Sequence, residues 1–88
     1  MATTVGPVSS EIRAAFGQRV RGLRLARGLS QEQTALRAGF SARYLSDVER
    51  GARNVGLENI SLLASALEIR LAELFDDSAI DTSTRRSP

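Results

Sequence analysis

Residues 30–51 read SQEQTALRAGFSARYLSDVERG, and this stretch decides the fold of the 88-residue chain. It contains two short helical patterns that meet at Gly39. Each pattern opens with a serine, Ser30 or Ser41, whose hydroxyl can accept hydrogen bonds from the free N–H groups of a first helical turn. The spacing from Ser30 to Gln33 also matches a capping box. The stretch therefore predicts two short helices joined by a tight turn.

The second of these helices, over 41–51, has a polar face opposite an apolar pair, Leu45 and Val48. Residues three and four apart share a helix face, so this pair is expected to point inward. The residues expected to lie outward or at the edges are Ala42, Arg43, Ser46, Asp47 and Arg50. Two helices joined in this way form a helix-turn-helix, and a small helix with this polar face suits the major groove of DNA.

Apolar residues at helical spacing continue on both sides of the pair. Before it, the stripe Ile12, Phe16, Val20 and Leu23 predicts a helix that is capped by Ser9 or Ser10 and stops at Gly28. After it, apolar residues between 57 and 67 predict a fourth helix, and those between 69 and 75 a short fifth one.

The expected fold class is therefore all-α, with one compact five-helix domain over 9–76 that contains the helix-turn-helix at its second and third helices. A flexible arm at 1–8 is expected before this domain, and a disordered tail at 77–88 after it.

The composition excludes several classes of site. The chain has no cysteine and no histidine, so disulfides, thiolate nucleophiles, imidazole bases and the commonest zinc sites are excluded. There is also no nucleophile–base pair and no phosphate-binding loop, so we expect no catalytic residue, metal or cofactor, and no enzyme. No apolar run is long enough to span a bilayer, and the first residues do not resemble a secretory signal, which predicts a cytoplasmic protein without a membrane partner.

Charge is distributed unevenly along the chain, although the net charge is only +2. Up to residue 53 there are nine arginines and four acidic residues, whereas residues 54–84 hold one arginine and six acidic residues. The first part can therefore face phosphates while the second does not.

Residues 12–75 resemble the Cro and lambda-repressor-like helix-turn-helix family. Within that family, YLSDVERGARN at 44–54, followed by GLENI at 56–60 and ALEI at 66–69, is similar to the controller proteins of restriction–modification systems. The resemblance implies a sequence-specific transcriptional regulator that binds a palindromic operator in double-stranded DNA as a homodimer. A regulator bound near a promoter could also contact RNA polymerase, which no residue of the sequence specifies.

The resemblance also implies roles for single residues. Ala42, Arg43, Ser46 and Asp47 would read bases, led by Arg43, whose guanidinium can bond guanine O6 and N7 together. Ala42 could touch a thymine methyl and Asp47 could accept from cytosine N4. Two alternatives stay open: Arg43 is only solvated, or Asp47 is a helix-face charge or a partner of Arg43.

Further roles concern the DNA backbone and the protein itself. The residues implied to contact sugar and phosphate are Gln31, Tyr44, Arg50, Arg53 and Asn54. Arg24 and Glu49 are implied to form a partly buried structural ion pair. Leu71, Leu74 and Phe75 are expected in the dimer interface, with the alternative that these residues only seal the core of the monomer.

Three departures from the family pattern matter. Thr34 and Leu36 exchange the usual apolar and polar positions of the second helix, so this helix is either rotated or exposes Leu36. Glu68 and Arg70 replace the usual glycine and serine after the fourth helix, so that boundary is continuous or shifted. Ala42 stands where many controller proteins carry an arginine, which leaves the operator sequence open.

A second hypothesis is a helical protein–protein interaction module, antitoxin-like or of the phage-adaptor type, with minor DNA binding. Binding of a partner chain by Leu36 and the C-terminal leucines would favour it. A steep salt dependence of DNA binding would favour the regulator.

Overall fold

The computed structural model describes the backbone of residues 6–75 and the side chains of residues 10–75. Within this range the chain forms four α-helices and one 3-10 helix: α1 (Gly6–Ala26), α2 (Gln31–Ala38), α3 (Ala42–Glu49), α4 (Leu57–Leu67) and η1 (Leu71–Phe75). The all-α fold class is confirmed. The expectation of five α-helices is wrong, because the last segment is a short 3-10 helix, which begins with a bond from the Glu73 N–H to the Arg70 carbonyl.

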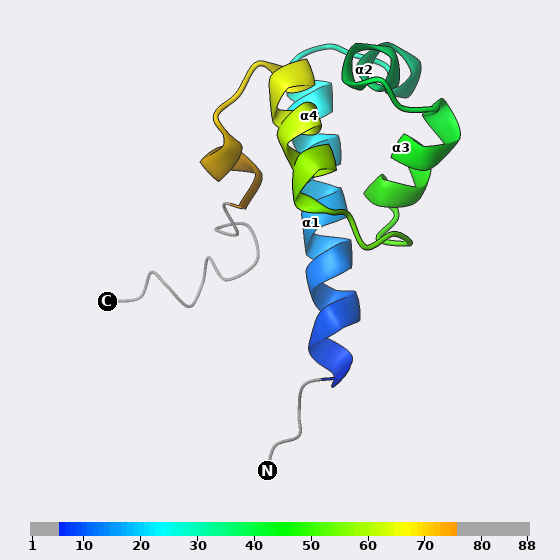
Figure 1. Ribbon diagram of the computed structural model, residues 1–88, viewed down its shortest axis with the longest axis vertical. Helices are drawn as coiled ribbons and strands as arrows, with labels where there is room; N and C mark the ends of the chain where they lie inside the picture. Colours follow the sequence, from blue (N-terminus) through cyan, green and yellow to red (C-terminus); the bar gives the residue numbers. More distant parts are fainter. Residues whose placement is uncertain (1–5, 76–88) are drawn as a thin grey trace.

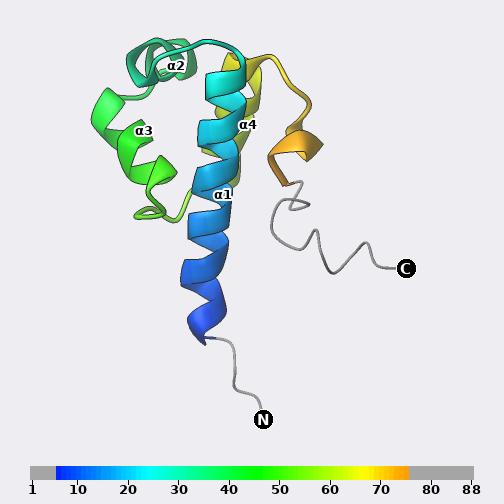
Figure 2. The same cartoon turned by 180° about the vertical axis from the view of Figure 1, so that it is seen from behind.

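Helix α1 runs along the length of the molecule and organises the other elements (Figure 1). Helix α3 contacts one side of α1 and η1 contacts the opposite side, an arrangement that the view from behind also shows (Figure 2). Helix α2 packs on both α3 and α4, and η1 packs on α4. The helix-turn-helix pair thus lies at one side of α1, away from the C-terminal 3-10 helix.

Helix α1 begins at Gly6, earlier than the sequence predicts. The expected start at a capping Ser9 or Ser10 is therefore wrong, and the first turn of α1 falls within the stretch expected to be an arm. The N-terminal end of α1 extends past the other helices (Figures 1 and 2), so Ile12 is exposed while Val20, on the same stripe, is fully buried. The tail expected at 77–88 lies outside the described residues.

Each long element contributes to one hydrophobic core. The largest fully buried apolar side chains come from α1, α3, α4 and η1: Val20, Leu45, Val48, Leu63, Leu67 and Leu74. The inward orientation predicted for Leu45 and Val48 is confirmed. Helix α2 contributes small residues to this core region, Ala35 and Ala38, which permit its close packing on α4.

The unusual pattern of α2 leaves a polar atom inside and an apolar side chain outside. Thr34 is fully buried, and its Oγ1 has no hydrogen-bond partner. Leu36 is 81% exposed. Of the two possibilities the sequence left open, the structure therefore has α2 exposing Leu36.

A break separates α4 from η1 even though no glycine is present. Helix α4 ends at Leu67, and Glu68 takes the left-handed conformation (φ 59°) in which its N–H donates to the carbonyls of Ala64 and Ser65. This geometry is normally supplied by glycine, because a Cβ is strained there. The end of α4 is therefore neither continuous with the next helix nor shifted along the chain. Glu68 instead takes the strained left-handed conformation at the position where glycine is usual.

Candidate nucleic-acid interface

Local caps set the ends of the two helices of the helix-turn-helix. The Ser30 hydroxyl accepts from the Gln33 N–H at 2.9 Å, and the Gln33 side chain accepts from the Ser30 N–H at 2.8 Å, which completes the predicted capping box. The Ser41 hydroxyl accepts from the Tyr44 N–H at 3.0 Å. Gly39 ends α2 in the left-handed conformation (φ 82°). The capping box thus fixes the start of α2, and Gly39 and Ser41 fix the turn between α2 and α3.

A buried ion pair fastens the C-terminal end of α3. Arg24 Nε donates to Glu49 Oε2 at 2.6 Å and Arg24 Nη2 donates to Oε1 at 3.0 Å, with side chains only 8% and 3% exposed. Arg24 Nη1 also donates to the Leu29 carbonyl, and Gln31 Nε2 donates to Glu49 Oε1 at 3.0 Å. The structure thus brings together α1, the start of α2 and the end of α3 at one carboxylate.

A glycine of α1, which no motif in the sequence marks, allows α3 to approach closely. A Cβ on Gly17 would lie 2.5 Å from the Glu49 carbonyl oxygen and closer still to that of Val48. A Cβ on Gly51, which has φ 79°, would lie 2.8 Å from Ala14 Cα. The end of α3 therefore rests directly on the backbone of α1, and only a hydrogen fits between them.

The outer face of α3 carries one arginine, Arg43, whose side chain has no partner among residues 10–75. Arg43 lies in the first turn and is exposed, and within residues 10–75 its guanidinium takes part in no hydrogen bond or ion pair. Ala42 and Ser46, on the same helix, are half-buried. The Ser46 hydroxyl accepts from Arg50 Nη1 at 3.0 Å. Among the four residues expected to read bases, Arg43 is the one whose side-chain donors are all left available by the described part of the chain.

Asp47 is buried, although helical spacing predicts it outward or at the edge of α3. It is 8% exposed, and both carboxylate oxygens are occupied: Oδ1 by Arg50 Nη2 at 2.5 Å and Oδ2 by Arg53 Nε at 3.4 Å. The partner is therefore not Arg43 but two arginines, one of them in the loop after α3. The alternative that Asp47 pairs with Arg43 is therefore wrong, and a role of Asp47 in base reading stays a prediction.

Of the residues expected at the DNA backbone, Arg50, Arg53 and Asn54 lie at the end of α3 and in the following loop, and Arg53 reaches back to Tyr44 in the first turn of α3. The Arg53 guanidinium lies 5.3 Å from the centre of the Tyr44 ring, within the range of a cation–π contact. The Tyr44 hydroxyl accepts from Asn59 Nδ2 at 3.1 Å. Asn59 is not among the site residues that the sequence predicts. Asn54 is exposed. Gln31 lies apart from this group, at the start of α2, where Glu49 holds its amide.

The residues expected in a dimer interface divide into one buried and two exposed side chains. Leu74 is 1% exposed and belongs to the core of the monomer, which corrects its expected place in an interface. Leu71 and Phe75 are about half exposed. The alternative that these residues seal the core therefore holds for Leu74.

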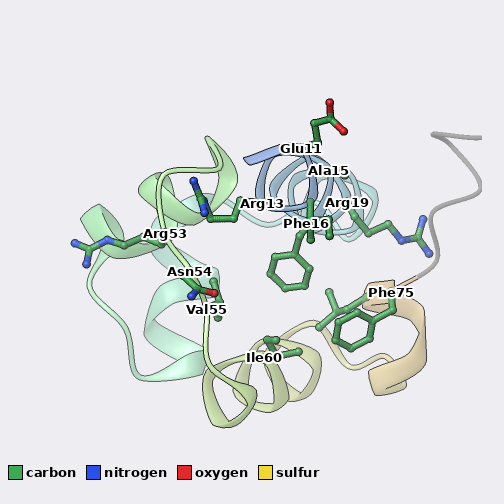
Figure 3. Close-up of a pocket in the computed structure, with 12 residues that line it drawn as sticks. Glu11, Arg13, Ala15, Phe16, Arg19, Arg53, Asn54, Val55, Ile60 and Phe75 are labelled. Atoms are coloured by element: carbon green, nitrogen blue, oxygen red, sulfur yellow. The ribbon is translucent and has the colours of Figure 1, made fainter. Parts of the chain in front are cut away.

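Phe75 also lines a groove of about 420 Å³ between α1, residues 53–55, α4 and η1 (Figure 3). Figure 3 shows Phe16 pointing into the middle of this groove, toward the side where Ile60 and Phe75 lie, and the two phenylalanine rings are 6.1 Å apart. Arg13 and Arg53 stand at its edge. The groove is thus apolar inside and positively charged at one rim.

The part of the chain that the structure describes holds no cluster of three or more acidic, histidine or cysteine side chains that could bind a metal. Within that same part, no helix has the length and the apolar character needed to cross a membrane.

Comparisons with known proteins agree with this geometry. The helix-turn-helix family profile matches residues 20–74, which include α2, α3 and α4. Control protein C.BamHI of Bacillus amyloliquefaciens is 40% identical over 74 residues, covering 83% of this chain and 91% of that protein. Control protein C.MunI of a Mycoplasma species is 38% identical over 69 residues, covering 77% and 93%.

A solved structure is also similar. The restriction–modification controller protein C.AhdI of Aeromonas hydrophila superposes with a TM-score of 0.73 and 52% sequence identity, covering 74% of this chain and 98% of that one. The chain therefore belongs to the helix-turn-helix family.

Proposed function

We propose that the chain is a DNA-binding transcriptional regulator that places α3 in the major groove of its operator. The observation that carries the proposal is the contrast between the two sides of α3. Its inner side is held by the buried Glu49, while its outer side presents the exposed, uncommitted guanidinium of Arg43. A rigidly held helix with an available cation at its N-terminal turn is the arrangement that direct readout in the major groove requires.

In this proposal Arg43 donates two hydrogen bonds to one guanine. Ala42 adds an apolar contact to a neighbouring thymine methyl, and Ser46 reads or approaches a base edge further along the helix. Each good bidentate pair contributes about 1–3 kcal/mol of discrimination against the wrong base.

Backbone contacts position the helix in the groove. Arg50 and Arg53 keep their guanidinium groups largely in solvent, and Tyr44 and Asn54 lie on the same part of the molecule. Gln31 donates one amide hydrogen to Glu49, so the second amide hydrogen of its Nε2 is the donor left for a phosphate. These groups give binding energy without reading the sequence.

A homodimer on an inverted repeat completes the proposal. One short helix reads only a few base pairs. A two-fold symmetric dimer places a second α3 on a second half-site, about 10–10.5 base pairs away, and so doubles the number of base pairs read. Leu71 and Phe75 supply exposed apolar surface for this contact, on the side of α1 opposite to α3. The similarity to restriction–modification controller proteins suggests the same role here, and contact with RNA polymerase stays a prediction without an assigned residue.

Fluorescence anisotropy with a labelled random-sequence duplex tests DNA binding at about 50 and 200 mM salt. About six phosphate contacts would lower the affinity by roughly 10³ between these concentrations. Sedimentation of the free protein tests the dimer, and Phe75→Ser should weaken it. Absence of binding at the lower salt would contradict the proposal and favour a protein-interaction module, for which the exposed Leu36 is the candidate contact.

A further inference from the structure

The cluster around Asp47 has a feature that phosphate binding alone does not require: a carboxylate inside a group of cations. Asp47 joins Arg50 of the α3 end to Arg53 of the following loop, and its own carbonyl accepts from the Ala52 N–H at 2.9 Å. Tyr44 packs under Arg53. In a surface that binds an anionic polymer, a negative charge lowers the affinity, so its place here calls for a function.

The carboxylate leaves both arginines able to bind a further anion. A guanidinium has five N–H donors, of which Asp47 and Ser46 occupy two in Arg50 and Asp47 one in Arg53. The side chains of Arg50 and Arg53 are 62% and 50% exposed. The remaining donors therefore belong to side chains that are at least half exposed and are tied to Asp47 through another donor.

We infer that Asp47 is a specificity-determining residue that acts by positioning Arg50 and Arg53, not by reading a base. This inference rests on the proposed DNA binding. A phosphate that arrives where the fixed guanidinium groups already point gains their hydrogen bonds with the Asp47 contacts intact. A phosphate in any other position gains hydrogen bonds from Arg50 or Arg53 only if that arginine leaves Asp47, because the phosphate and the Asp47 carboxylate then compete for the same donors.

Asp47 should therefore lower the affinity for DNA that is not bound in the register that α3 reads. DNA seated in the register that α3 reads presents its phosphates in one constant arrangement, whereas random DNA presents many. Asp47 thus lowers the affinity for random DNA more than the affinity for the operator. It also cancels about half of the charge of the two arginines, which reduces the salt dependence of random binding.

The test compares wild type with Asp47→Asn, which keeps the size and one acceptor but loses the charge. Each protein is titrated with a random-sequence duplex and with the duplex that wild type enriches from random DNA, at several salt concentrations. For Asp47→Asn we expect several-fold tighter random binding, a lower operator-to-random ratio, and a salt slope steeper by about 0.9.

Two variants serve as controls. Glu11→Gln loses the same charge on α1, where the side chain points away from Arg53 (Figure 3), and should leave the ratio unchanged. Asp47→Glu keeps the charge and should keep the wild-type salt slope. In a background of Arg50→Gln and Arg53→Gln, Asp47→Asn should have no further effect on the ratio. Circular dichroism melting establishes that each variant is folded.

Several outcomes would overturn the inference. An unchanged ratio and slope in folded Asp47→Asn would do so while leaving the proposed function intact, because wild type would still bind its operator. If Asp47→Asn binds the operator more weakly, and changing one operator base pair restores the affinity, then Asp47 reads that base. An effect that persists without the two arginines, or a steepened slope in Asp47→Glu, would also contradict it. Wild type that binds no DNA would remove the proposed function and this inference together.

Discussion

Arg24 and Glu49 join α1 to the last residue of α3 through two charge-assisted hydrogen bonds, at 2.6 and 3.0 Å, in a region closed to solvent. Both groups have additional partners, the Leu29 carbonyl for the arginine and the Gln31 amide for the glutamate. Such a pair fixes geometry more than it adds stability, because desolvation offsets much of the attraction. Its removal from one side, however, leaves an unpaired buried charge.

We therefore expect Glu49→Ala to lower the free energy of unfolding by about 3–5 kcal/mol and to weaken DNA binding at the same time. Urea unfolding followed by circular dichroism measures the first effect. Glu32→Ala, at an exposed glutamate of α2, should change stability by about 0.5 kcal/mol or less. Equal midpoints for Glu49→Ala and wild type would contradict the role given to the pair.

Two glycines of α1 should respond in opposite directions to the same substitution. Gly17→Ala places a methyl group against the carbonyls of Val48 and Glu49 and should lower the free energy of unfolding by about 1–3 kcal/mol or more. Gly22→Ala has open space around the new methyl and should raise it by about 0.5–1 kcal/mol. Thermal melting of the two variants side by side measures both, and a shift of the same sign would contradict the close approach of α3.

Thr34→Val should stabilise the protein. The substitution replaces a buried hydroxyl without a hydrogen-bond partner by a methyl group of the same shape, so the free energy of unfolding should rise by about 1–2 kcal/mol. Thr34→Ser, which keeps the hydroxyl and loses the methyl group, should instead destabilise. A destabilised valine variant would show that the hydroxyl has a partner in solution.

Glu68→Gly should also raise the free energy of unfolding, by about 1 kcal/mol, because glycine takes the left-handed conformation without strain. The substitution removes ion pairs with Arg27 and Arg37, which are exposed and contribute little. Glu68→Ala removes the same ion pairs and keeps the strain. The glycine variant should therefore melt above the alanine variant, and the reverse order would contradict the account of this helix end.

Features that depend on neighbours in sequence were predictable. Residues within one or two helical turns determine the serine caps, the left-handed conformation of Gly39 and the inward orientation of the Leu45 and Val48 side chains. The pairing of Arg24 with Glu49 was implied only by resemblance, because no local pattern links residues 25 apart.

Features that depend on tertiary contacts were missed or misread. No local pattern marks Gly17, because the carbonyls of Val48 and Glu49 that lie against it come 31 and 32 positions later in the chain. Asp47 looked outward by helical spacing, but the loop after α3 returns Arg53 to cover it. Leu74 could equally have sealed the core or met a partner, and only the packing of η1 on α4 decides for the core.

The central claim is that α3 reads DNA through Arg43, and selection of binding sites from random duplexes tests it most directly. Wild type, Arg43→Ala and the control Arg21→Ala, at an exposed arginine of α1, are selected in parallel and the enriched duplexes sequenced. We expect wild type and Arg21→Ala to enrich the same inverted repeat, and Arg43→Ala to lose preference for one guanine in each half-site, by about 1–3 kcal/mol. An identical enriched sequence with Arg43→Ala, or no enrichment by wild type, would contradict the claim.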